Sequence, residues 1–325
     1  MIRAGPKPRG LRPDRGAVAS AFPTERLVRP RRGGSSAPVH AGRLAAPLAT
    51  LSSSVLEREI QGVRPPAVAG SFYPAEPAAL RALVDRLLAA RSEARSGAMP
   101  KALIVPHAGY VYSGPVAAAA FARVASHAGR LERVVLLGPA HRIFVHGLAW
   151  PGAARLRTPL GEVVVDVEAI REAARALPGV RADAAAHARE HSIEVMLPFV
   201  QRLAPAAKVV PLIGSTAPAA DVGRVLEALW GGAETLIVIS SDLSHYLPYA
   251  VARSRDENTA ERIAGLDGVL SGDDACGAVG INGLLWVARQ RGLRVELVDL
   301  RSSGDTAGTR DEVVGYGAFA LYEAA

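Results

Sequence analysis

The feature that most constrains this chain is a regular alternation of short apolar runs with longer stretches in which apolar residues recur at helical spacing. Runs rich in Val, Ile and Leu are typical of strands that are buried on both faces of a sheet. They occur at residues 102–106, 133–137, 163–165, 208–213, 235–240, 295–300 and 316–322. Helical patterns occur at residues 80–88, 115–124, 168–177, 219–230, 250–263 and 279–291. This order predicts a single α/β domain with a central, largely parallel or mixed sheet and helices on both faces.

The composition is that of a globular protein of a reducing compartment. Hydrophobic residues make up 49% and charged residues 21% of the 325 residues, which is enough for a sizeable core. No long apolar run is free of charges, so we expect no transmembrane helix and no membrane partner. The start of the chain also lacks the apolar segment and cleavage site of a secretory signal. The single cysteine, Cys276, excludes an intrachain disulfide framework, and we therefore expect a cytoplasmic protein.

The net charge of +7 arises from the N-terminal segment alone. Residues 1–64 contain 12 basic and 4 acidic residues, and the rest of the chain contains 26 basic and 27 acidic residues. Because the body of the chain has no basic stripe, we expect no nucleic-acid partner. Residues 1–60 are rich in Arg, Pro, Gly and Ser and lack periodicity, which predicts a disordered basic extension before a folded domain at residues 61–325. The alternatives are a transit peptide, disfavoured by the many Pro and Gly residues, and an over-extended gene start.

Polar side chains follow several of the predicted strands directly. His107 comes after the run 102–106, His141 follows the run 133–137 through a tight Gly-Pro-Ala turn, and Asp242 follows the run 235–240. The carboxyl ends of parallel strands meet at one edge of a sheet, where α/β proteins bind their ligands. A single histidine at such a point is more often a capping or core residue. Several together favour a shared site.

Asp242 and His245 lie three residues apart just after a predicted strand. On a helical turn they would share a face, so that the acid could orient the imidazole or both could face a metal. The structural alternative is that Asp242 is only the N-cap of the following helix.

His191 and Glu194 show the same spacing, in the segment Glu-His-Ser-Ile-Glu that opens the apolar pattern at 191–203. A role for His191 in a site competes here with ordinary helix-start chemistry, in which Ser192 would be the cap. Pro198 lies within the pattern and predicts a helix that is kinked or begins late.

Cys276 precedes Gly277 at the apparent start of the helix 279–291. Lone cysteines are usually small buried hydrophobic residues. The N-terminus of a helix, however, favours the thiolate, which is the form that binds metals. Both interpretations are open on the sequence alone.

Taken together, seven segments in order along the chain resemble the Memo family, whose prokaryotic members are often named AmmeMemoRadiSam system protein B. These segments are 64–74 (RPPAVAGSFYP), 106–110 (PHAGY) with Ser113-Gly114, 138–141 (GPAH), 190–194 (EHSIE), 240–246 (SSDLSHY), 276–277 (CG) and 302–306 (SSGDT). They extend from about residue 63 to the C-terminus, so residues 1–60 lie outside the resemblance.

The resemblance implies a fold similar to that of the class III extradiol non-haem iron dioxygenases. It also implies that His107, His141 and Cys276 bind a metal and that Asp242 and His245 line the same pocket, with His245 at the position of an acid/base histidine. The dioxygenases complete their site with a carboxylate, whereas a thiolate stands here. A His₂Cys set is softer and suits iron or copper redox chemistry, with zinc the weaker expectation. The family name further suggests a functional link with a radical S-adenosylmethionine enzyme and an AMMECR-type protein.

Three functions compete on this basis. The first is an iron- or copper-dependent oxidoreductase, in which His245, Asp242 and His191 act near the metal on an unknown substrate. The second is a non-enzymatic module that binds a small molecule or peptide, or acts as a scaffold, with a vestigial dioxygenase-like site. The third is a zinc hydrolase, which a thiolate ligand favours less than redox chemistry. Aromatic residues are only 5% of the chain, which leaves few anchors for a large protein interface.

Overall fold

The computed structural model describes residues 62–91, 97–177, 179–267 and 269–323. All of them belong to one compact unit, Leu51–Ala325. The predicted disordered extension at residues 1–60 lies outside the described residues. Within the described part of the chain, no helix combines the length and the apolar character needed to cross a bilayer.

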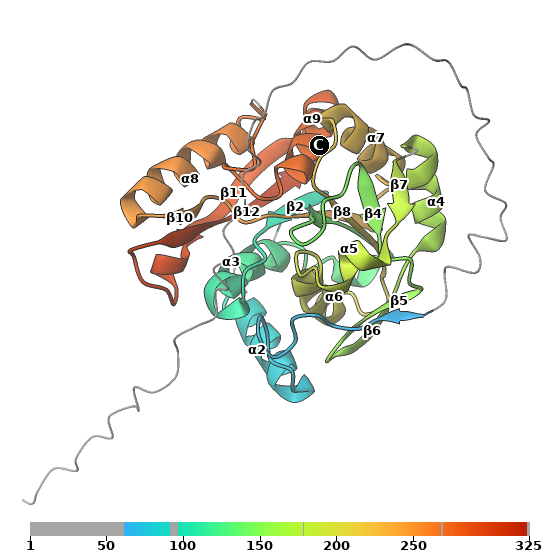
Figure 1. Cartoon of the computed structure of the whole chain (residues 1–325), viewed down its shortest axis with the longest axis horizontal. Helices are drawn as coiled ribbons and strands as arrows, with labels where there is room; N and C mark the ends of the chain where they lie inside the picture. The colour runs from blue at the N-terminus through green and yellow to red at the C-terminus, as the bar shows by residue number, and fades with distance from the viewer. Residues whose placement is uncertain (1–61, 92–96, 178, 268, 324–325) are drawn as a thin grey trace, which may run out of the picture. The chain divides into compact units, whose positions relative to one another are not determined.

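A large mixed sheet forms the centre of this unit (Figure 1). Its strands follow the spatial order β10-β12-β2-β9-β3-β8-β4-β7, and β11 pairs with β12. They are β2 (Ala102–Val105), β3 (Arg133–Pro139), β4 (Leu148–Trp150), β7 (Val180–Ala182), β8 (Lys208–Gly214), β9 (Thr235–Ser240), β10 (His245–Leu247), β11 (Arg294–Ser302) and β12 (Val313–Tyr322). A smaller sheet, in the order β1-β5-β6, contains β1 (Val63–Arg64), β5 (Arg155–Thr158) and β6 (Gly161–Val164).

The middle of the large sheet is parallel, as predicted. Strands β2, β9, β3 and β8 pair in parallel with one another, and nearly all their residues are buried. Burial on both faces explains why these segments are continuous apolar runs without the alternation of a half-exposed strand. Antiparallel partners flank them, with β12 beside β2 and β4 beside β8. The parallel core therefore brings four strand carboxyl ends to one edge.

Helices cover both faces of this sheet. They are α2 (Pro77–Ala89), α3 (Tyr110–Ala122), α4 (Val167–Ala176), α5 (Ala184–Ala188), α6 (Leu197–Leu203), α7 (Ala219–Ala228), α8 (Tyr249–Ala264) and α9 (Ala278–Arg291). Helix α7 packs on α9 and α4, and α2 packs on α3 and α6. Short 3-10 helices of one turn each are η2 (Ala128–Arg130), η3 (Glu194–Met196) and η4 (Ser303–Asp305). The predicted fold class, a single α/β domain with helices on both faces, is confirmed.

The helix in the pattern 191–203 begins late, one of the two outcomes predicted from Pro198: α6 starts at Leu197 with Pro198 in its first turn, where a missing N–H costs nothing. Two of the capping alternatives are wrong. Ser192 is not the cap of α6, since its hydroxyl donates to the Pro139 carbonyl at 2.8 Å. Asp242 is not an N-cap either: the chain continues into strand β10, and α8 follows Pro248 without a side-chain cap.

Candidate metal centre

Three histidines converge at the carboxyl edge of the parallel strands. His107 follows β2, His141 follows β3, and His191 lies in the turn before η3. One ring nitrogen of each lies within 4.8 Å of the others. The His141 and His191 rings stack at 4.7 Å between centroids, and His107 stands edge-on to both at 5.2 and 5.4 Å. The strand-end argument anticipated His107 and His141. Its third histidine was His245, which follows β9 but is not in this group, and the structure has His191 there instead.

The hydrogen bonds of Ser240 fix the tautomer of His107. Ser240 is the last residue of β9, and its hydroxyl donates its one proton to the Ser192 carbonyl at 2.5 Å. The same oxygen lies 2.7 Å from Nδ1 of His107 and must therefore accept a proton from it. The Nε2 lone pair of neutral His107 is thus directed away from Ser240, into the cluster. Burial, followed by repulsion from His141 and His191, holds the pKa of His107 well below its usual range and keeps the ring neutral.

Glu190 orients His141 in the same way. The carboxylate is fully buried and accepts from Nδ1 of His141 at 3.0 Å and from its backbone N–H at 2.6 Å. It also accepts the backbone N–H groups of His191 and Ser192, at 2.8 and 2.9 Å. Burial alone would lower the pKa of His141, but hydrogen bonds to Cys276 and Glu190 outweigh it and raise the pKa to about 10. Despite the opposing effect of burial, the hydrogen bond and charge of His141 hold the pKa of Glu190 well below its usual range.

His191 is held by packing. Its ring contacts those of Phe72 and His141, each 4.7 Å away between centroids. Its Nδ1 is buried, lies 3.4 Å from Glu190 and makes no hydrogen bond. Burial, followed by the charge of His141, lowers the pKa of His191 to about 4, so the ring is neutral at pH 7. A neutral imidazole with an unused buried nitrogen is a potential metal ligand.

Cys276 lies beside the histidine cluster. Its Sγ lies 3.4 Å from Nε2 of His107 and accepts the backbone N–H of Asp242 at 3.3 Å. It lies directly before Gly277, the N-cap of α9. A Cβ at Gly277 would come within 2.5 Å of the Ser240 carbonyl oxygen, so only glycine lets the chain pass β9 closely enough to place this thiol. The thiol is therefore part of the site and not a remote core residue.

Asp242 has a different position from the one expected. Its buried carboxylate accepts the backbone N–H of His107 at 2.7 Å and also bonds the N–H of Ala108. Burial raises its pKa to about 7, although these two bonds act in the opposite direction. It therefore braces the turn that carries His107, and its neighbouring backbone N–H reaches Cys276. The helical turn that would have joined it to His245 does not form.

His245 lies further out, on the edge strand β10. Burial, with a contribution from the charge of His141, lowers its pKa. Among the described residues no hydrogen bond or ring contact joins it to the three clustered histidines. The next residue, Tyr246, is 57% exposed and adopts a left-handed backbone with φ of 55°. Such a conformation is uncommon for a bulky residue and often occurs beside functional sites.

The donor set fits a transition metal. In a tetrahedral site with ordinary metal–sulfur and metal–imidazole bonds, sulfur and nitrogen lie about 3.5 Å apart, close to the 3.4 Å between Cys276 and His107. His107 and His141 each use their second nitrogen on a partner that fixes the ring, as metal-binding histidines do. Those partners, Ser240 and Glu190, were not identified as site residues from the sequence. Each is distant in sequence from its histidine, and no local pattern reports such a pairing.

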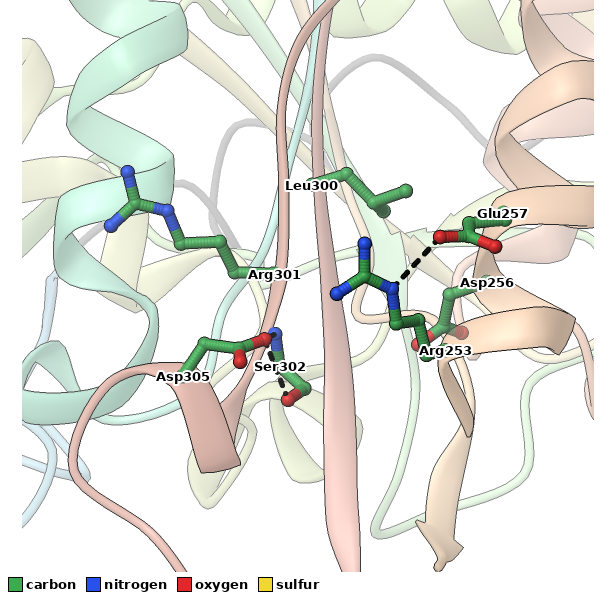
Figure 2. Close-up of a pocket in the computed structure, with 7 residues that line it drawn as sticks. All are labelled: Arg253, Asp256, Glu257, Leu300, Arg301, Ser302 and Asp305. Carbon is green, nitrogen blue, oxygen red and sulfur yellow. Dashed lines mark hydrogen bonds and ion pairs between the residues drawn. The ribbon is translucent and has the colours of Figure 1, made fainter. Parts of the chain in front are cut away.

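A cavity of about 310 Å³ lies elsewhere, between α8 and β11 (Figure 2). Five charged side chains line it, and several are already paired: Arg253 with Glu257 at 2.9 Å, and Asp305 with the Ser302 hydroxyl at 3.0 Å. Asp256 accepts the backbone N–H of Ser244 at 3.0 Å, which connects this region to the chain before His245. Its polar groups bond one another and leave no convergent set of free ligands, so we place the functional site at the histidines.

Comparison with known proteins agrees with the segments found in the sequence. Residues 64–320 match the family described as "Memo-like protein". A MEMO1 family protein of Aquifex aeolicus is 37% identical over 269 residues, covering 78% of this chain and 97% of that protein. MEMO1 family proteins of Pyrobaculum arsenaticum and Methanopyrus kandleri are 35% and 34% identical, with the same coverage. The α/β fold is consistent with the predicted likeness to the extradiol dioxygenases, and the chain belongs to the Memo family.

Proposed function

We propose that this protein binds one iron or copper ion through His107, His141 and Cys276 and uses it in redox chemistry on a small molecule. The single observation that carries the proposal is the arrangement of second ring nitrogens. Ser240 holds Nδ1 of His107 and Glu190 holds Nδ1 of His141, while Sγ of Cys276 lies against Nε2 of His107. Two oriented imidazoles and a sulfur are a soft set that suits iron or copper better than a hard cation.

The metal would supply a redox couple and an electrophilic centre for the bound molecule. The chain's own residues would do the rest. Ser240 keeps neutral His107 in the ligating tautomer, and Asp242 keeps the His107 turn in place. Glu190 orients the ring of His141, which is protonated without a metal and would give up its Nε2 proton on binding one. We assign proton transfer to His245, which is half-buried near the cluster and makes no ring contact with it. We assign one of two roles to His191: a neutral imidazole that faces the bound small molecule, or an additional metal ligand.

A second candidate is a binding module without catalysis. The observation in its favour is that Cys276 and His107 can satisfy each other by a hydrogen bond at 3.4 Å, so the cluster is stable as a purely polar network. In that case the pocket would hold a small molecule or peptide. The suggested link to a radical S-adenosylmethionine enzyme and an AMMECR-type protein is compatible with either candidate.

The test is metal stoichiometry after anaerobic loading with Fe(II) or Cu(I). Wild-type protein should bind one ion per chain. Cys276→Ser replaces a soft thiolate by a protonated oxygen and should lower the affinity more than the 10- to 100-fold typical of losing an orienting partner. The Asp242 carboxylate bonds only backbone N–H groups, and Asp242→Asn keeps the shape of the side chain. This variant should therefore lose much less metal affinity. If Cys276→Ser keeps full stoichiometry and affinity, the thiol is not a ligand and the binding-module candidate becomes the better one.

A further inference from the structure

The segment Arg64–Tyr73, which we call the strap, is one of the family segments, yet it contributes none of the proposed ligands. It runs from the end of β1 to just before α2, far in sequence from His141 and His191. Several of its contacts nevertheless reach residues of the metal centre or their immediate neighbours.

A buried carboxylate anchors the strap to the turn that contains His191. Glu194 has no exposed surface. It is bonded by four donors of the strap: the Arg64 guanidinium, the Ala67 N–H at 2.8 Å, the Val68 N–H at 3.0 Å and the Tyr73 hydroxyl at 2.5 Å. A buried carboxylate with this many donors is well compensated for its loss of solvation. The strap is therefore fixed to this turn.

The strap also contacts the segments that carry His107 and His191, and it reaches His141 through Glu190. Arg64 donates to the backbone carbonyl of Glu190, the residue whose carboxylate holds His141. The carbonyl of Phe72 accepts the Tyr110 N–H at 2.8 Å, three residues after His107. The ring of Phe72 packs on His191 with centroids 4.7 Å apart. One short segment thus touches the surroundings of His107 and His191 directly and those of His141 through Glu190.

Phe72 matters because nothing polar fixes the His191 ring. Ser240 and Glu190 orient the other two imidazoles, but the buried Nδ1 of His191 makes no hydrogen bond. The rotation of this ring about its Cβ–Cγ bond is limited by its ring neighbours, of which Phe72 and His141 are the nearest at 4.7 Å between centroids and His107 lies at 5.4 Å. Phe72 is the only one of these three that is not itself part of the histidine cluster, and removing its ring would remove one of the two nearest contacts.

We propose that the strap is a positioning element of the metal centre, and that Phe72 is the residue that holds His191 against His141. The effect on metal binding rests on the proposed function, whereas the placement of His191 does not. Packing orients the ring of His191, whereas hydrogen bonds orient the rings of His107 and His141.

The placement is tested first without metal, on protein labelled with ¹³C-histidine. In Phe72→Ala the ring signals of His191 should move and broaden, because a neighbouring ring current and a packing contact are lost. The ring of His127, whose Nε2–H donates to the Gly97 carbonyl at 3.0 Å, serves as the internal reference and should not move. Ser71→Ala is the matched control, since Ser71 is exposed on the same strap and bonds only the Val68 carbonyl.

The consequence is tested by anaerobic titration with Co(II), a spectroscopic substitute for iron. Phe72→Ala should bind Co(II) about tenfold more weakly, in the range of other orienting losses, with an altered visible spectrum. Phe72→Leu should recover part of the affinity, and Ser71→Ala should match the wild type. Unchanged His191 signals and Co(II) affinity in folded Phe72→Ala would overturn the inference. If His191 moves but even the wild type binds no metal, the proposed function fails while the positioning of His191 by the strap stands.

Discussion

The two edges of the parallel sheet both hold buried titratable side chains, but they treat them differently. At the amino edge, Lys101 precedes β2 and is 5% exposed. Its ammonium donates to the carbonyls of Gly232 at 2.7 Å, Thr235 at 2.9 Å and Gly231 at 3.4 Å. Each of its three protons has an acceptor, so nothing is left to bind a ligand. At the carboxyl edge, Nδ1 of His191 has no hydrogen-bond partner, and Nε2 of His107 and Sγ of Cys276 meet each other at 3.4 Å.

The difference between the two edges separates buried polar groups that stabilise the fold from those that are available to bind a ligand. Native structures satisfy nearly all buried polar groups, so an imidazole nitrogen without a partner beside a close thiol–imidazole pair needs an explanation. The proposed metal would give these side chains a common ligand. If this distinction is right, changes at the amino edge should affect stability alone, and changes at the carboxyl edge should affect binding more than stability.

The largest effect should come from His141→Ala. It removes a proposed ligand and leaves the buried Glu190 carboxylate without its imidazole. Iron or copper content after anaerobic loading should fall from one per chain to near zero, with affinity lower by more than about 100-fold. Full metal content in this variant, measured by elemental analysis, would show that the carboxyl edge does not bind metal through this residue.

A pH effect should come from His187, a buried histidine outside the cluster. Burial, partly offset by its bond to Ala149, lowers its pKa to about 4. The unfolded chain takes up this proton near pH 6.5 and the folded one only near 4, so stability is fully present above pH 6.5 and is lost as the pH falls towards 4. At about 1.4 kcal/mol per unit of pKa, the loss approaches roughly 3 kcal/mol. Urea unfolding between pH 7 and 4 should show this slope, and a similar slope in His187→Gln would assign it to other groups.

A smaller loss of stability should follow Lys101→Met. The substitution keeps the length of the side chain but leaves three carbonyls at the amino edge without their donor. We expect the free energy of unfolding to fall by about 2 kcal/mol, with metal stoichiometry equal to that of the wild type. A loss of metal binding in the folded variant would break the separation between the two edges.

The smallest effect should come from Ser240→Ala. It removes the acceptor that fixes the tautomer of His107 but keeps every proposed ligand. Metal affinity should fall about tenfold, the lower end of the range for an orienting partner, while the melting temperature changes little. Isothermal titration with Co(II) measures this directly, and an affinity loss as large as that of His141→Ala would mean that Ser240 does more than orient the ring.

The sequence predicted the part of the fold that depends on local apolar pattern. The parallel core strands and the long helices lie where their patterns indicated. The strands that were missed, β1, β4, β5, β7 and β10, have two to four residues each, and their pairing rather than their composition makes them strands.

The candidate site divides in the same way. His107 and His141 follow strands and could be located from order alone, and Cys276 was added by family resemblance. The roles of Glu190 and Phe72 depend on contacts with residues that are distant in the chain. The brace formed by Asp242 depends on a backbone turn that replaces the expected helical one. Spacing within one segment carries no information about such long-range pairs.

X-ray absorption at the metal edge of wild-type protein, loaded anaerobically with Fe(II), tests the central claim most directly. The account predicts one sulfur neighbour at about 2.3 Å, with imidazole nitrogens at about 2.1 Å, and loss of the sulfur contribution in any iron retained by Cys276→Ser. Bound iron with only nitrogen and oxygen neighbours, or a sulfur contribution that survives Cys276→Ser, would contradict it.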